Sequence, residues 1–208
     1  MAEQIARLDP ASHQSDPYKR VTATLVRAFL QDPLKIRLAP DYQGRERMLY
    51  WLLGGVVRYC LVYGEVYTNA DVSGAACWLP PGYAHLRLWG SLRAWGLLPG
   101  TLGAMPPNRL WLSLQMQSFI EKQHERCMPG PHWYLFLLGV SPERQGQGVG
   151  SSLIEPVLRR ASLDGLPCYL ETQTSQNVSF YQKHGFTVVD QGEPRGLGMP
   201  LWFMTRMP

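Results

Sequence analysis

The pattern of apolar positions is most informative in residues 133–154, where it changes from an unbroken run to a helical period. Residues 133–140 are almost all apolar, as in a central strand that is buried on both faces. Pro142 follows and cannot donate to a strand ladder, because it has no backbone N–H. From Val149 onward, apolar residues recur with the spacing of a helix that packs on a sheet. The segment therefore predicts a strand, a short loop and a helix.

Three glycines lie in the loop between this strand and this helix. Gly146, Gly148 and Gly150 alternate with larger residues, so the backbone can bend tightly and a ligand can approach it without meeting Cβ atoms. The first N–H groups of a helix have no partner within the helix, and the helix dipole adds partial positive charge there. A phosphate or diphosphate group is therefore the expected ligand of this loop.

Apolar periodicity and turn residues predict further elements on both sides of this segment. Helices are predicted at residues 16 to about 32, 44 to about 63 and about 108–126, the last being the second of two helices expected within 83–131. Strands are predicted as a hairpin of 65–68 and 74–79, as a strand that reaches Glu171, and as a last strand within 202–208. A short helix is expected to begin at Ser175 or Asn177 and to be closed by Gly185. The helix after the glycine loop is expected to kink at Pro156 and to continue, because its apolar stripe extends further.

Composition places the chain among ordinary globular proteins. Of 208 residues, 45% are hydrophobic and 17% are charged, and we expect one domain that spans residues 1–208. The net charge is +4, and the basic residues are scattered rather than concentrated, so we expect no nucleic-acid partner. The most hydrophobic long stretch, residues 83–103, contains Arg87, Arg93 and Pro99, so we expect no segment that spans a membrane.

The cysteines and the first residues bear on the cellular compartment. Cys60, Cys77, Cys127 and Cys168 include no C-x-x-C pair, which favours buried reduced thiols over disulfides or a zinc site. The first ten residues lack the basic region and apolar core of a signal peptide. We therefore expect a cytoplasmic protein without a metal ion.

Two common nucleotide-binding motifs fit the glycine loop poorly. A mononucleotide P-loop needs a Lys directly after its last glycine, and none is present. A dinucleotide fold needs G-x-G-x-x-G directly after a strand and an acidic residue about 20 positions later. Glu171 lies at that distance, but the glycines run G-x-G-x-G, and too little chain follows Glu171 for a doubly wound sheet.

A third pattern matches in detail. Gln145–Gly150 reads Q-x-x-G-x-G, with Val140 and Pro142 ahead of it, and it resembles the acyl-CoA-binding motif of the GNAT superfamily of N-acetyltransferases. Asn177–Phe186 resembles the second conserved helix of that family and the strand after it, and residues 202–208 resemble its last strand. The resemblance implies an α/β (α+β) fold: a mixed, mostly antiparallel central sheet with a splayed pair of parallel strands and flanking helices.

Other short segments resemble one subgroup of this family. Leu170–Thr172, Trp78–Gly82 and Met204–Arg206 are similar to segments of the subgroup that includes puromycin N-acetyltransferase. The family resemblance implies acetyl-CoA as co-substrate and a small-molecule amine as acceptor. A GNAT-like module that binds acyl-CoA as a sensor or scaffold, without turnover, is the alternative. The sequence leaves the identity of the amine and the oligomeric state open.

The resemblance also implies a set of cofactor contacts. Backbone groups of Leu138 and Val140 would bond the pantetheine arm, and Gly139 would suit a strand distortion that frees these groups. The residues expected to contact the cofactor are Leu138, Gly139, Val140, Gln145, Gly146, Gln147, Gly148, Val149, Gly150, Ser151, Asn177 and Tyr181.

Acetyl transfer to an amine needs a general acid and a general base. Tyr181 occupies the family's general-acid position, and a phenol with a pKa of ~10 can protonate a thiolate of similar basicity. Asn177 lies four residues earlier, on the same helix face, and either bonds the pantetheine or begins the helix. Glu171 is the first candidate for the base. His132, His124 and Glu65 are the other candidates, whereas His184 is assigned no chemistry.

Overall fold

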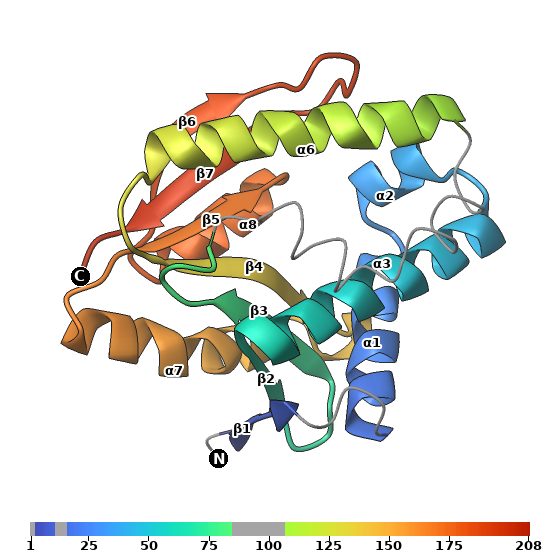
Figure 1. Cartoon of the computed structure of the whole chain (residues 1–208). Helices are drawn as coiled ribbons and strands as arrows, with labels where there is room; N and C mark the ends of the chain where they lie inside the picture. Colours follow the sequence, from blue (N-terminus) through green and yellow to red (C-terminus); the bar gives the residue numbers. More distant parts are fainter. Residues whose placement is uncertain (1–2, 11–15, 85–106) are drawn as a thin grey trace.

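The computed structural model describes residues 3–10, 16–84 and 107–208, which are organised around one seven-stranded sheet (Figure 1). The strand order is β1-β2-β3-β4-β5-β7-β6. Only the pair of β4 and β5 is parallel among the pairs of this sheet, which confirms the predicted mixed, mostly antiparallel arrangement. The strands are β1 (Ile5–Arg7), β2 (Glu65–Asn69), β3 (Gly74–Leu79), β4 (Trp133–Val140), β5 (Cys168–Thr172), β6 (Thr187–Gly192) and β7 (Leu201–Arg206).

Helices cover both faces of the sheet. They are α1 (Asp16–Phe29), α2 (Pro33–Leu38), α3 (Tyr42–Tyr63), α6 (Pro107–Cys127), α7 (Val149–Leu163) and α8 (Ser175–Gln182). Apolar residues of α1, α3 and α6 form a core on one face, and those of α7 and α8 form a core on the other. Figure 1 shows α6 along β6 and β7, and α1 and α3 beside the half of the sheet that contains β2 and β3.

Residues of β5 alternate between these two cores, as strand geometry requires. Tyr169 belongs to the core beneath α1, α3 and α6, whereas Cys168 and Leu170 belong to the core beneath α7 and α8. Glu171 continues the alternation on the side of Tyr169, where its carboxylate accepts a hydrogen bond from Tyr134. Each face of the sheet therefore brings its own side chains to the end of β5.

Strands β4 and β5 separate after two residue pairs. Trp133 pairs with Cys168, and Tyr134 pairs with Tyr169. Beyond these pairs β4 stays with β3 as far as Val140, while β5 stays with β7. The facing edges of the two central strands are therefore unpaired over the rest of their length, a region that we call the β4–β5 opening. The splayed parallel pair expected from the sequence is confirmed.

A β-bulge in β4 lies at Phe136, and the prediction of a distortion at Gly139 is wrong. Cys77 pairs with Leu137 and Trp78 pairs with Leu135, so Phe136 is the extra residue. Gly139 keeps a regular partner on β3. Its lack of a side chain has another cause, because helix α1 packs directly against it: a Cβ at Gly139 would lie 2.7 Å from Leu25 Cδ2 and 2.9 Å from Phe29 Cε2.

The substitution Gly139→Ala tests this close packing. The added methyl group would overlap side chains of α1, so we expect the free energy of unfolding to fall by about 1–3 kcal/mol. Denaturant titration measures this change. Gly130→Ala is the matched control, since a Cβ at Gly130 would meet nothing within 4 Å. Equal stability of the two variants would show that α1 does not press on β4.

Two short elements within the first 40 residues were not predicted from the sequence. Strand β1 is only three residues long and pairs with β2. Asp32 and Pro33 were interpreted as the end of the first helix, but they begin α2: the Asp32 side chain accepts a hydrogen bond from Lys35 N at 3.1 Å, and Pro33 lies in the first turn. An Asp-Pro pair can follow the end of one helix or begin the next. Here it begins α2, because helix α1 has already ended at Phe29.

The remaining predicted elements agree with the structure where it describes them. Helix α7 continues past Pro156 to Leu163, as its apolar stripe predicted. Helix α6 coincides with the second helix expected in residues 83–131. The first of those two helices falls on residues 85–106, outside the described part of the chain.

Candidate active site at the β4–β5 opening

The loop between β4 and α7 presents a run of unpaired backbone donors. None of the amides from Gly146 to Ser151 has a hydrogen-bond partner among the residues that the structure describes. Gly146 and Gly148 have φ angles of 75° and 85°, a conformation that L side chains rarely adopt. Helix α7 begins directly after Gly148, so its N-terminal dipole adds to these donors. This arrangement suits an anion such as a diphosphate.

Two glutamine side chains stabilise this loop by hydrogen bonds to backbone carbonyls. Gln145 Nε2 donates to the Val140 carbonyl at 3.0 Å, and Gln147 Nε2 donates to the Glu143 carbonyl at 2.9 Å. The amide of Gln145 bonds to the Pro142 carbonyl at 3.4 Å, so it is not part of the unpaired run. The two glutamines of the motif therefore hold the shape of the loop, while the residues after Gln145 offer the free amides.

The edge of β4 that faces β5 also carries free amides. Ser141 N–H donates to the Ser73 carbonyl at 2.8 Å and therefore points toward β3. Because N–H groups of successive strand residues point to opposite edges, the amides of Val140 and Leu138 point toward β5. At this level β5 has already separated from β4. These amides consequently face the β4–β5 opening.

A contact between Ser151 and His184 joins the first turn of α7 to the turn after α8. Ser151 Oγ lies 3.0 Å from His184 Nε2, and the His184 ring lies 4.8 Å from the Phe180 ring. Burial lowers the pKa of His184 below its ordinary value, so the ring is mostly neutral at pH 7.

Helix α8 supplies Tyr181 from the face of the sheet that α7 covers. Thr174 caps this helix, its Oγ1 accepting from Asn177 N at 3.2 Å, so Asn177 is exposed in the first turn and does not begin the helix. Tyr181 follows one turn later and is only 8% exposed. Burial, together with the charge of Glu171, raises the pKa of the Tyr181 phenol above its ordinary value. The phenol therefore stays protonated at neutral pH.

Glu171 reaches the same opening from the other face. Its Oε1 accepts a hydrogen bond from the Tyr134 hydroxyl, while its Oε2 is buried without a partner among the described residues. Burial raises the pKa of Glu171 to about 7, although the bond from Tyr134 opposes this shift. A carboxylate with such a pKa can accept a proton at neutral pH and release it again.

The other candidate bases are engaged elsewhere. Glu65 is buried between Arg7 and Arg160 and also accepts from Tyr67, so it is part of a structural ion-pair network. His124 and His132 are buried with their Nε2 atoms 2.8 Å apart. The Gly130 carbonyl can only accept, so His132 Nδ1–H donates to it over 2.6 Å. In a neutral pair, His132 Nε2 then accepts from His124 Nε2–H. Both imidazoles therefore have structural partners, which leaves Glu171 as the base that the geometry favours.

Tyr134 was missed in the sequence, where it is one residue of an apolar run. Its hydroxyl is the group that bonds Glu171, and its ring lies 4.6 Å from the His124 ring. The only available signal was a phenol at a position where a central strand ordinarily carries an aliphatic side chain.

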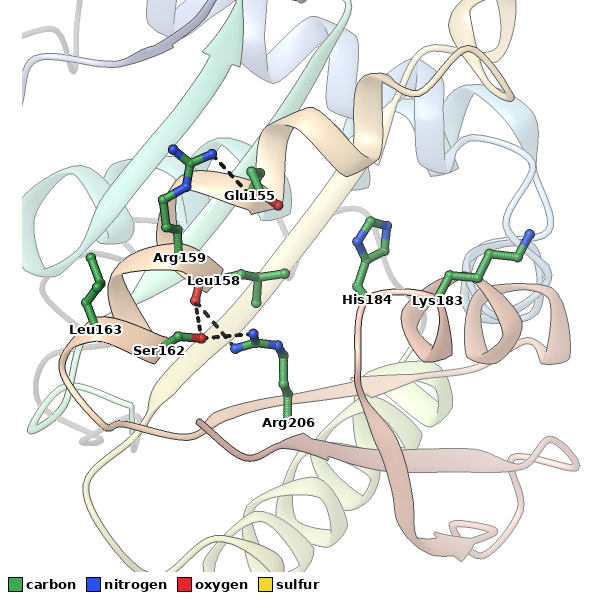
Figure 2. Close-up of a pocket in the computed structure, with 8 residues that line it drawn as sticks. All are labelled: Glu155, Leu158, Arg159, Ser162, Leu163, Lys183, His184 and Arg206. Carbon is green, nitrogen blue, oxygen red and sulfur yellow. Dashed lines mark hydrogen bonds and ion pairs between the residues drawn. The ribbon is translucent and has the colours of Figure 1, made fainter.

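Two hollows lie near these residues. One, of about 520 Å³, lies between the second half of α7 and the turn after α8, with Lys183, His184 and Arg206 among its lining residues (Figure 2). Figure 2 shows Arg159 paired with Glu155 there. The other, of about 70 Å³, is lined by residues of α6 and by Tyr134. Neither Glu171 nor Tyr181 lines the larger hollow, so we place the chemistry at the β4–β5 opening.

Within residues 3–10, 16–84 and 107–208, no group of three His, Cys, Asp or Glu side chains could hold a metal ion. Among the helices in these ranges, none is long and apolar enough to cross a membrane. The four cysteines are free thiols, and Cys60, Cys77 and Cys168 are buried, as predicted.

Comparison with known proteins agrees with this geometry. Residues 106–186 match the model of the acetyltransferase (GNAT) family. An uncharacterized N-acetyltransferase of Schizosaccharomyces pombe is 29% identical over 180 residues, which cover 83% of this chain and 72% of that protein. A peptidyl-lysine N-acetyltransferase of Salmonella typhimurium is 33% identical over 96 residues, which cover 46% of this chain and 62% of that protein.

Solved structures show the same fold. A structure described as histone acetyltransferase HPA2 and related acetyltransferase, from Corynebacterium glutamicum, has a TM-score of 0.66 at 21% identity and covers 100% of this chain and 97% of its own. A polyamine N-acetyltransferase of Drosophila melanogaster has a TM-score of 0.59 at 14% identity, covering 99% and 100%. The chain thus has the GNAT fold, and its residues 106–186 match the model of the GNAT family.

Proposed function

We propose that this chain, which has the fold and the family match of the GNAT superfamily, is an acetyl-CoA-dependent N-acetyltransferase for the primary amine of a small molecule. The observation that carries the proposal is the position of Glu171 and Tyr181, which approach the end of β5 from opposite faces of the sheet. An acceptor amine and a thioester that enter from the two faces would meet between a base and an acid.

The cofactor contacts follow from the free backbone amides. The amides from Gly146 to Ser151 would hold the diphosphate, and those of Leu138 and Val140 would bond the pantetheine arm and the thioester oxygen. Gly139 would contribute backbone only, because its Cα faces α1. Asn177 is exposed near the start of α8, where its amide could bond the pantetheine.

The proposed reaction is a direct attack on the thioester. Glu171 Oε2 takes one proton from the neutral acceptor amine as the amine nitrogen bonds to the carbonyl carbon. The amide of Val140 stabilises the negative charge that develops on the carbonyl oxygen. The carbon–sulfur bond then breaks, and the departing thiolate receives the phenolic proton of Tyr181. The products are the N-acetylated amine and CoA.

A panel of amines with acetyl-CoA tests this function through the release of free thiol. The panel contains an aliphatic diamine, an aromatic amine and a lysine-containing peptide, because the acceptors named for the relatives include peptidyl lysine and polyamines. Thiol release that depends on a small amine supports the proposal. Acetyl-CoA binding without transfer to any amine would instead favour a sensor or scaffold module, the alternative that the fold permits.

The similarity to the puromycin N-acetyltransferase subgroup suggests an acceptor pocket that tolerates an aromatic group, which is why the panel includes one. We also propose a single domain, because one sheet takes strands from residues 5–7 and from 201–206. The free cysteines support a cytoplasmic location.

The substitution Gly150→Ala tests the cofactor loop without straining it. Gly148 has a positive φ, so any side chain there would disturb the backbone itself. A Cβ at Gly150 would lie 3.4 Å from Phe180 Cζ and 3.7 Å from Val140 Cγ2, which is ordinary contact distance. The methyl group would fill the space beside the first turn of α7, so we expect acetyl-CoA affinity to fall at least about tenfold.

Calorimetric titration with acetyl-CoA measures this affinity, and thermal unfolding checks that the fold is kept. Gly130→Ala, remote from the loop, should bind acetyl-CoA as the unaltered protein does. Unchanged affinity of Gly150→Ala would mean that the diphosphate does not lie at the first turn of α7.

A further inference from the structure

We infer that Tyr134 is a positioning residue of the proposed reaction, because its hydroxyl fixes one carboxylate oxygen of Glu171 and leaves the other for the acceptor. This inference rests on the proposed function. The Tyr134 hydroxyl donates to Glu171 Oε1, and Oε2 has no partner among the described residues. Tyr134 lies on β4 and Glu171 on β5, so this hydrogen bond links the two strands beyond their last backbone pair.

An aromatic cluster holds the Tyr134 ring in place. The His124 ring meets it edge-on at 4.6 Å and stacks on the Tyr169 ring at 4.1 Å with an interplanar angle of 12°. His124 is itself held by His132, whose Nε2 lies 2.8 Å from its own. Tyr134 is only 3% exposed, so the phenol has little freedom to turn away from Glu171. Helix α6 therefore helps to orient the candidate base Glu171 indirectly, because its His124 holds the ring of Tyr134.

The hydrogen bond also sets the charge state of Glu171. Burial disfavours the carboxylate, and the donated O–H stabilises it, so the bond lowers a pKa that burial raises. Among the described residues, the titratable side chains that interact with Glu171 are Tyr134 of β4, Tyr169 of β5 and Tyr181 of α8. His124 of α6 stacks on Tyr169, and β7 places Phe203 opposite Glu171. Of these groups, Tyr134 is the one bonded to the carboxylate. Without its hydroxyl, Glu171 would hold its proton to a higher pH.

The substitution Tyr134→Phe tests the inference, and Tyr169→Phe is its matched control. Both tyrosines are buried members of the same cluster, but the Tyr169 hydroxyl has no partner among the described residues. A hydrogen bond to a charged group contributes enough to shift a pKa by about one unit or more. We expect the acid limb of the profile of kcat/KM against pH to move up by about one unit in Tyr134→Phe and to stay in place in Tyr169→Phe.

A second measurement does not depend on turnover. Carbon-13 NMR of protein with labelled glutamate side chains follows the Glu171 carboxyl through its titration, with Glu171→Gln used to assign the signal. The inference expects the pKa of Glu171 to rise in Tyr134→Phe alone, together with the kinetic limb. It is overturned if the Glu171 titration is the same in all proteins, or if that titration moves while the kinetic limb does not. Absence of transfer by the unaltered protein to every amine defeats the proposed function instead, and it is seen before any variant is compared.

Discussion

The substitution Tyr181→Phe is expected to lower kcat about 10²-fold or more, because the departing thiolate would lose its proton donor. The change removes one oxygen atom from a residue that is 8% exposed, so the packing of α8 on the sheet should persist. Acetyl-CoA affinity should therefore be unchanged. Steady-state kinetics with the best amine of the panel, together with calorimetric titration of acetyl-CoA, measures both quantities.

Tyr59→Phe is the control for this substitution. Tyr59 is a 3% exposed tyrosine of α3, which packs on the opposite face of the sheet from α8. Its loss of a hydroxyl should leave kcat unchanged. If Tyr181→Phe turned over as fast as the unaltered protein, Tyr181 would not be the acid. A sensor module would also keep its acetyl-CoA affinity in Tyr181→Phe, so the change in kcat is the quantity that separates the two functions.

The substitution Glu171→Gln should lower kcat/KM at neutral pH by about 10²-fold or more, since an amide cannot accept the proton of the acceptor. The acid limb of the pH profile near pH 7 should disappear with it, because the pKa of Glu171 is raised to about 7. Kinetics from pH 5.5 to 9 with one amine at saturating acetyl-CoA test both effects. Retention of that limb in Glu171→Gln would contradict the assignment of the base.

In Glu171→Gln, the thermal stability at pH 8 should rise although the activity falls. The folded protein raises the pKa of Glu171 from 4.5 to about 7, so it binds a proton more readily than the unfolded chain does. This side chain therefore contributes stability below about pH 4.5 that is lost as the pH rises through 7. Glu171→Gln cannot ionise, so it should unfold at a higher temperature than the unaltered protein at pH 8 and show no such advantage at pH 4.5.

Glu65→Gln provides the matched contrast. Glu65 is also a buried carboxylate, but Arg7 Nη1 lies 3.0 Å from its Oε1, and Arg160 bonds its other oxygen. Removing this charge leaves two guanidinium groups without their partner, so stability should fall at pH 8. Activity per folded molecule should be kept. The two substitutions thus distinguish Glu65, a carboxylate that stabilises the folded protein, from Glu171, a carboxylate whose ionised form destabilises it.

The glycine loop could be predicted from the sequence because its chemistry is local. Gly146 and Gly148 adopt backbone angles that the alternation of glycines indicated, and the unpaired amides follow from their position at the start of a helix. The parallel pair and its separation came from resemblance to a family, since periodicity alone does not say which strands are neighbours.

The parts that sequence reasoning missed depend on contacts between distant segments. Gly139 was interpreted as the site of a distortion within its own strand, but a glycine is needed there because helix α1 packs closely against it. Tyr134 and Glu171 are far apart along the chain and meet only because β4 and β5 are neighbours in the sheet. Tertiary packing therefore determined what each of these residues does.

A crystal structure with bound CoA tests the central claim most directly. The account predicts that the diphosphate bonds the backbone amides of residues 146–151 and that the CoA sulfur lies in the β4–β5 opening between the Tyr181 phenol and the Glu171 carboxylate. A diphosphate held in the 520 Å³ hollow by Lys183 and Arg206, with the sulfur remote from Tyr181, would contradict it.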